Sequence, residues 1–171
     1  MGAVLEMILV AGFGNLLHRD DAFGVRLLER LRDNPELPPE VKLLDAGIGG
    51  MHFVQELFSG YRAVVILDAL EGQTPGQVRV LQASVTDPRT LPPRVERDML
   101  ADLHYAEPGR AMAMAKALDK LPPKAYIVGC VPAVIDLGLG MSPEVENALP
   151  IAETKLIKLL KNLLKAEEVG R

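Results

Sequence analysis

The stretch from Ala11 to Gly24, AGFGNLLHRDDAFG, constrains the fold more than any other part of the sequence. An apolar run that begins at Met7 leads into its Gly-x-Gly turn, and the acidic pair Asp20 and Asp21 stands where a helical pattern begins. This order indicates a strand, a tight loop and a helix. Such a unit places two carboxylates at the exit of the loop.

The loop allows two interpretations. In a dinucleotide-binding turn, glycines let the backbone approach a pyrophosphate, and the helix N-terminus supplies positive potential. Here Leu17 occupies the position of the third glycine of G-x-G-x-x-G, and two carboxylates would repel a phosphate at that helix end. The helix dipole stabilises charged carboxylates there, and carboxylates suit a metal cation. The loop therefore favours a carboxylate-presenting turn.

The composition indicates one compact soluble domain. The chain has 171 residues, is 49% hydrophobic and carries a net charge of −4. This length supports one full core but not two ordinary domains. We therefore expect a single domain over residues 1–171, with residues 1–6 as an N-terminal extension.

Several classes of function do not fit this composition. Aromatic residues make up 4% of the chain and do not interleave with clustered Lys or Arg, which argues against a nucleic-acid partner. The sequence has neither an apolar run of about 18 residues nor a recognisable signal segment, so we expect a cytoplasmic protein outside the membrane. A single cysteine, Cys130, excludes an internal disulfide framework and a cysteine-based zinc site.

Apolar runs and helical patterns alternate along the rest of the chain. The expected strands cover residues 7–11, 41–44, 63–67, 77–82 and 125–131, and helical patterns follow at 20–33, 51–58, 108–118 and 142–164. This alternation predicts an α/β fold: a three-layer domain with about five strands in a mostly parallel twisted sheet and helices on both faces.

Prolines lead to two local predictions. The segment 83–97 is polar and proline-rich, so we expect a long loop there. Pro150 interrupts the last helical pattern, so we expect a short helix followed by a second one. The lysines of that second helix, from Lys155 to Lys165, are expected to form a solvated face.

Four aspartates follow the strands of the predicted sheet: Asp20, Asp21, Asp45 and Asp68. In parallel sheets, ligands bind outside the carboxyl ends of the strands. Two or three carboxylates with one imidazole at that edge would suit a borderline divalent ion such as nickel or zinc.

Each candidate residue also has a purely structural interpretation. Asp68 could cap the turn after its strand, and one residue of the acidic pair could cap the following helix. Asp45 precedes AGIGG and could simply form a turn, while His104 could be a surface histidine. Cys130 ends an apolar strand without a recognisable histidine partner, so we interpret it as a buried, inert thiol.

Taken together, GFGNLLHRDDAFG, LLDAGIGG, VVILDA, a later histidine and VGCVP…GLGMSPEV resemble the [NiFe]-hydrogenase maturation proteases. These endopeptidases remove the C-terminal extension of the hydrogenase large-subunit precursor. The resemblance runs from about Met7 to Leu164. It departs from the usual family pattern at Ala22, where glycine is common, and in the DAGI segment, where DGGT or a near relative is common.

The resemblance implies a role for each candidate residue. The nickel-contacting and catalytic positions correspond to Asp21, Asp68 and His104, and the loop containing Asp45, Gly47 and Gly49 would help to select the precursor. Nickel would arrive in the precursor's own site, so the protease needs no organic cofactor and no resident metal.

We therefore hypothesise a cytoplasmic, nickel-dependent endopeptidase whose partner is a [NiFe]-hydrogenase large-subunit precursor. One alternative is a non-proteolytic protein of the same fold that binds or carries nickel or a nucleotide. Another is a protease of this fold with a different substrate, as in spore germination.

Overall fold

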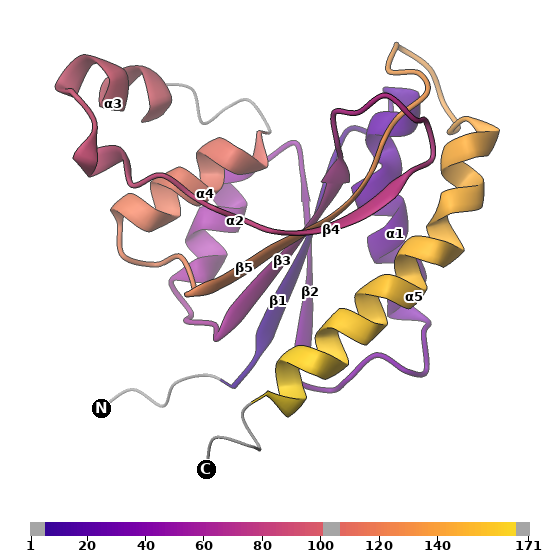
Figure 1. The fold of residues 1–171 in the computed structure, drawn as a ribbon, viewed down its shortest axis with the longest axis horizontal. Coiled ribbons are helices and arrows are strands. Elements are labelled where there is room, and N and C mark those ends of the chain that lie inside the picture. The colour runs from indigo at the N-terminus through magenta and orange to yellow at the C-terminus, as the bar shows by residue number, and fades with distance from the viewer. Residues whose placement is uncertain (1–5, 101–106, 167–171) are drawn as a thin grey trace.

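The computed structural model describes residues 6–100 and 107–166 (Figure 1). The strands are β1 (Ile8–Phe13), β2 (Val41–Gly47), β3 (Ala63–Ala69), β4 (Val78–Gln82) and β5 (Lys124–Cys130). The α-helices are α1 (Phe23–Arg32), α2 (Gly50–Leu57), α3 (Pro93–Leu100), α4 (Pro108–Ala117) and α5 (Pro143–Lys165). Two short 3-10 helices, η1 (Arg19–Ala22) and η2 (Pro88–Thr90), complete the elements. The extension expected over residues 1–6 lies almost wholly outside the described residues.

The five strands form one sheet in the order β2-β1-β3-β5-β4. The strands β2, β1, β3 and β5 run parallel, and only β4 pairs antiparallel, with β5. This architecture confirms the predicted five-stranded, mostly parallel sheet. It also brings the loops that follow β1, β2, β3 and β5 to the same edge, which we call the carboxyl edge.

Helices cover both faces of the sheet, α1 and α5 on one and α2 and α4 on the other (Figure 1). Alternate residues of β1 serve the two cores, because successive side chains of a strand point to opposite faces. Ile8 and Val10 pack with the helices α1 and α5, whereas Leu9 and Phe13 pack with α2 and α4. The Phe13 ring meets the ring of Phe53 edge-on, with centroids 5.4 Å apart.

Gly24 explains how α1 comes so close to the sheet. A Cβ atom at this position would lie 2.1 Å from the carbonyl oxygen of Leu67 and 2.3 Å from that of Phe13. Only glycine permits this approach of the helix backbone to two strand ends. The residues just before α1, including Asp20 and Asp21, are thereby held at the carboxyl edge.

The segment 83–97 is not a plain loop, so that prediction was wrong. It contains η2 and the start of α3. The Asp87 side chain accepts a hydrogen bond from the Arg89 amide at 3.0 Å and caps η2, and α3 begins at Pro93. Proline is tolerated in a first helical turn because the amide there has no helical partner to lose.

Pro150 does not divide the last helix, and this prediction was wrong as well. The helix α5 runs unbroken over 23 residues with Pro150 inside it. Pro150 is exposed, and so is Glu146, the residue whose carbonyl loses its helical partner, so water can satisfy that group. The buried side of α5 continues across this point from Val145 to Leu163, and packing therefore outweighs one missing hydrogen bond.

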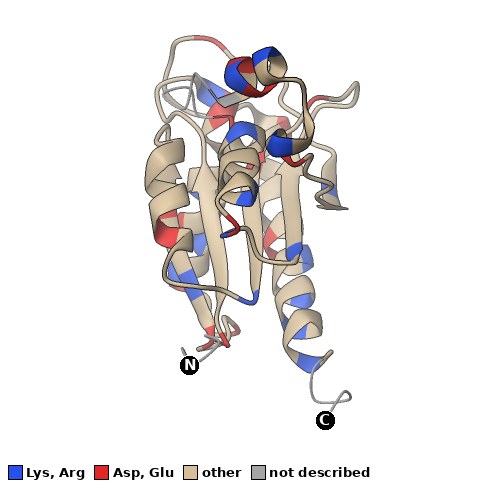
Figure 2. Cartoon of the chain, turned by 90° about the vertical axis from the view of Figure 1, so that its left-hand side faces the viewer, with Lys and Arg blue, Asp and Glu red and all other residues tan. Residues whose placement is uncertain are grey.

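Basic and acidic residues are interspersed along the elements on the side that carries α2, α3 and α4 (Figure 2). The lysines of α5 are mostly exposed, as expected, and Lys161 forms an ion pair with Glu36 at 2.5 Å. Within the described residues, we find no helix with the length and apolar character needed to cross a bilayer.

Candidate functional site

The loop after β1 is shaped by Asn15. Its amide donates a hydrogen bond to Oδ2 of Asp21 at 3.0 Å, and its side-chain oxygen accepts one from the Leu17 amide at 2.9 Å. The second contact is a local turn that asparagine forms readily. Gly14 is required here, because its φ is +133° and a Cβ would overlap the Asp21 carbonyl. The loop therefore holds the partly buried Asp21 carboxylate in a fixed place.

Asp68 lies at the end of β3, next to the end of β1 in the sheet, where Gly12 pairs with Leu67. Burial, with a smaller contribution from the negative charge of Asp21, raises the pKa of its carboxyl group to about 7, although a hydrogen bond from the Ala69 amide lowers it. Because the charge of Asp21 acts on Asp68 and η1 packs against β3, the two carboxylates lie near each other. The structure thus brings Asp21 and Asp68 together as an acid pair at the carboxyl edge.

Asp20 has a different role from its neighbour. It is fully buried and accepts four hydrogen bonds from the loop between β5 and α5. The donors are the amides of Ala133, Val134 and Ser142, at 2.8, 2.9 and 2.6 Å, and the Ser142 hydroxyl at 2.8 Å. Burial by itself raises the pKa of Asp20, but these hydrogen bonds outweigh it and hold the pKa below the ordinary value.

We call this arrangement the Asp20 clamp. It corrects the expectation that one residue of the acidic pair caps the following helix, because neither η1 nor α1 has a side-chain cap. Asp20 instead fastens the 131–142 loop, while Asp21 is a member of the acid pair. The role of Asn15 in this loop could have been predicted from the sequence, because asparagine after Gly-x-Gly favours a turn.

The loop that follows β2, which we call the β2 loop, lies beside the loop that follows β1. The Gly14 amide donates to the Gly47 carbonyl at 3.0 Å, and Gly47 has a positive φ of 51°. Asp45 is exposed, and Gly49 is the N-cap of α2. Both loops line a cavity of about 240 Å³, whose walls are Gly14, Asn15, Leu16, Val25, Asp45, Gly47 and Ile48.

His104, the third predicted nickel contact, lies outside the described residues. Across residues 6–100 and 107–166, no three His, Cys, Asp or Glu side chains converge in a group that could hold a metal ion. Of the three predicted nickel contacts, the described residues therefore contain two, Asp21 and Asp68. Cys130 is buried, and burial raises the pKa of its thiol to about 11, which fits an inert thiol.

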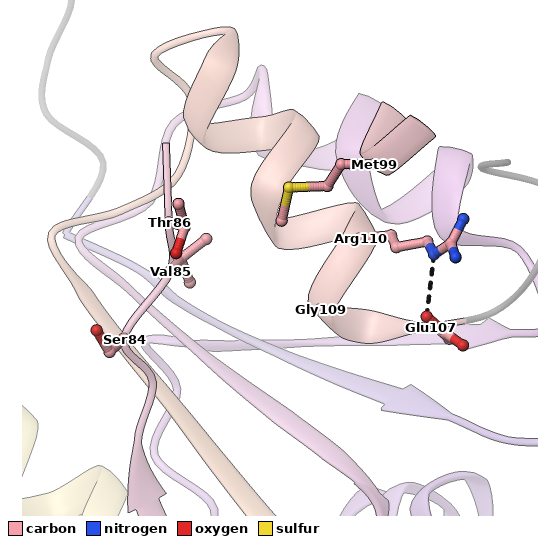
Figure 3. A pocket seen from close by; sticks show the side chains of 7 residues that line it. All are labelled: Ser84, Val85, Thr86, Met99, Glu107, Gly109 and Arg110. Atoms are coloured by element: carbon pink, nitrogen blue, oxygen red, sulfur yellow. Dashed lines mark hydrogen bonds and ion pairs between the residues drawn. The ribbon is translucent and has the colours of Figure 1, made fainter. Parts of the chain in front are cut away.

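A larger hollow of about 410 Å³ lies between the extended segment 84–86 and the helices α3 and α4 (Figure 3). Its walls are Ser84, Val85, Thr86, Met99, Glu107, Gly109 and Arg110. Glu107 and Arg110 form an ion pair at 3.0 Å. None of the described residues predicted for the site lines this hollow. The larger of the two cavities is therefore not the candidate active site.

Comparison with known proteins identifies the family. Residues 25–159 match the sequence profile described as hydrogenase maturation protease. The chain belongs to the hydrogenase maturation protease family. It is therefore an endopeptidase of hydrogenase maturation, and the acid pair is its candidate active site.

Individual relatives agree with this assignment. The hydrogenase expression/formation protein HupD of Rhodobacter capsulatus is 28% identical over 158 residues, which cover 91% of this chain and 72% of HupD. The hydrogenase 2 maturation protease of Escherichia coli is 27% identical over 156 residues, 90% of each chain. The solved structure of the hydrogenase maturating endopeptidase HybD from E. coli superposes with a TM-score of 0.72 at 26% identity, covering 91% and 93% of the two chains.

Proposed function

We propose that this maturation protease removes the C-terminal extension of a [NiFe]-hydrogenase large-subunit precursor, and that it does so only when the precursor carries nickel. The acid pair is the observation that carries this proposal. Asp21 lies in η1, after β1, and Asp68 lies near the end of β3. The two interact through their charges, although like-charged carboxylates repel each other. A cation from the substrate would relieve that repulsion.

The chemistry of the pair suits a metal that is delivered with the substrate. Two carboxylates and the imidazole of His104 would leave coordination positions open for ligands of the precursor. A borderline ion such as nickel binds carboxylates less well than imidazole or thiolate, so this set would hold free nickel weakly. Nickel at this place would act as a Lewis acid, either on the scissile carbonyl or on a bound water.

The β2 loop would contribute to the choice of precursor. Asp45 is exposed at the rim of the 240 Å³ cavity, and Gly47 and Gly49 shape the adjoining turn. A side chain of the precursor could enter this cavity while the nickel-bearing segment reaches the acid pair.

We also propose that the reaction takes place in the cytoplasm.

The test is the intact mass of the host's large-subunit precursor, nickel-loaded and nickel-free, after incubation with this protein. We expect the loss of one C-terminal peptide from the nickel-loaded precursor only. Asp68→Asn should abolish the cleavage, because it removes one negative charge without changing the shape of the side chain. Asp33→Asn is the matched control, since Asp33 is an exposed aspartate at the end of α1.

Cleavage of the nickel-free precursor at an equal rate would disprove nickel dependence. Normal cleavage by Asp68→Asn would remove Asp68 from the site. If no precursor changes mass, calorimetry with nickel and with nucleotides would test the carrier alternative.

A further inference from the structure

Two loops at the carboxyl edge expose large apolar side chains. Leu137 and Leu139 are 80% and 75% exposed, the highest values among the large apolar residues whose side chains the structure describes. Leu16 and Leu17, in the loop after β1, are 37% and 56% exposed. We call these four residues the leucine rim.

The two halves of the leucine rim lie side by side. The Gly138 amide donates to the Leu17 carbonyl at 2.8 Å, and the Gly138 carbonyl accepts from the Arg19 amide at 3.1 Å. Figure 1 shows the orange loop before α5 beside the indigo segment before α1. Leu137 and Leu139 flank Gly138 in the chain, so the two loops that carry the four leucines are joined by hydrogen bonds beside these residues.

The loop that carries Leu137 and Leu139 is firmly anchored. The Asp20 clamp holds it at Ala133, Val134 and Ser142, and Arg19 forms an ion pair with Asp136 at 2.6 Å. The leucines are therefore exposed on an ordered segment. An apolar surface whose ordering cost is already met in the free protein is preorganised for binding.

The leucine rim also adjoins the acid pair. Leu16 and Leu17 directly follow Asn15, whose amide holds the Asp21 carboxylate. Asp20, which fastens the 131–142 loop, directly precedes Asp21 in the chain. The surface and the candidate active site are thus joined through consecutive residues.

We infer that the leucine rim is the docking surface for an apolar patch on the folded large-subunit precursor. This inference rests on the proposed function, because it takes the precursor as the occupant. The inference is based on the connection between the rim and the candidate active site, in a protein whose family cleaves protein substrates. The acid pair would bind only the reacting segment of a protein substrate, whereas leucines buried at an interface would add non-directional affinity.

The test compares two double variants. Leu137→Gln/Leu139→Gln removes the two most exposed leucines of the rim. The control, Leu118→Gln/Ile151→Gln, removes one exposed apolar residue at the end of α4 and one on α5. All four positions are more than 40% exposed, so both proteins should fold, which circular dichroism and thermal unfolding would check. The probes are the purified precursor with nickel and without it.

We expect the rim variant to raise the Kd for the nickel-free precursor and the KM for the nickel-loaded precursor by about tenfold or more, with kcat within about twofold. The control variant should change neither. Equal Kd values for the two variants would overturn the inference, and so would a failure of the unmodified protein to bind either precursor. If the unmodified protein binds but does not cleave, the proposed function fails and the Kd comparison still decides the role of the rim.

Discussion

Asp20 and Asp68 are carboxylates at the same edge of one sheet, yet their environments have opposite effects. Burial raises the pKa of both, but at Asp20 four donated hydrogen bonds outweigh it, whereas at Asp68 the nearby charge of Asp21 adds to it. The folded protein stabilises the charge of Asp20 and opposes the charge of Asp68. Asp20 therefore contributes to stability, and Asp68 is held in an unfavourable state that a substrate cation could relieve.

Asp68→Asn should show the largest effect and should separate function from stability. We expect processing to fall by about a hundredfold or more, as when a group that stabilises charge in an active site is removed. Since the folded pKa of Asp68 is raised to about 7, its ionisation costs stability as the pH rises through that value. Urea unfolding at about pH 8 should therefore find the variant at least as stable as the unmodified protein; a clear loss of stability would contradict this account.

Asp20→Ala should give the opposite result. It would leave the amides of Ala133, Val134 and Ser142 without their acceptor, and the expected loss in the free energy of unfolding is about 3 kcal/mol or more. Asp136→Ala is the control in the same loop. Asp136 forms only an exposed ion pair with Arg19, so its loss should cost less than about 1 kcal/mol. Urea unfolding of both variants measures the difference, and equal losses would mean that the clamp is not what holds the loop.

The pH dependence of stability should also distinguish the two carboxylates. Because the pKa of Asp20 is lowered in the folded state, its contribution is present above the unfolded value near pH 4 and is lost as the pH falls through the folded value. For one group the slope reaches at most about 1.4 kcal/mol per pH unit. Asp20→Asn should lack this acid-sensitive part, which chemical unfolding between about pH 2 and pH 5 would reveal. Parallel stability curves for the two proteins would argue against a charged Asp20.

Ser142→Ala should have the smallest effect, because it removes one donor of the clamp and leaves the others in place. The Ser142 hydroxyl bonds to Asp20 and does not cap α5, so the expected loss is about 1 kcal/mol. Ser59→Ala, at an exposed position after α2, should be neutral. A loss as large as that of Asp20→Ala would show that the hydroxyl, and not the three amides, dominates the clamp.

The sequence predicted the sheet and its carboxyl edge because both follow from local patterns. Apolar runs that end at Asp45 or Asp68 indicate buried strands, and parallel topology then brings their ends to the same edge. The predicted nickel contacts remain a prediction. Asp21 and Asp68 do lie together in the described structure, while His104 lies outside it.

The different roles of Asp20 and Asp21 could not be predicted from their position in the sequence. The partners of Asp20 lie 113 to 122 residues further along the chain, and no local pattern connects them. The continuous α5 was missed for a similar reason, since its packing against the sheet outweighs the local effect of Pro150. The start of α3 was missed because the prolines of segment 83–97 indicated a loop, whereas Pro93 stands in the first turn of a helix.

The contact of Gly24 with the carbonyls of Phe13 and Leu67 has a consequence for how such enzymes diverge. Main-chain atoms fix the start of α1 against β1 and β3, and so they set the spacing between Asp21 and Asp68. Changes in the surrounding loops need not alter that spacing. If the acid pair is the cleavage centre, as proposed, a lineage could exchange one precursor for another by changing the residues at positions 16–17, 45–49 and 135–139 while the spacing of the pair is kept.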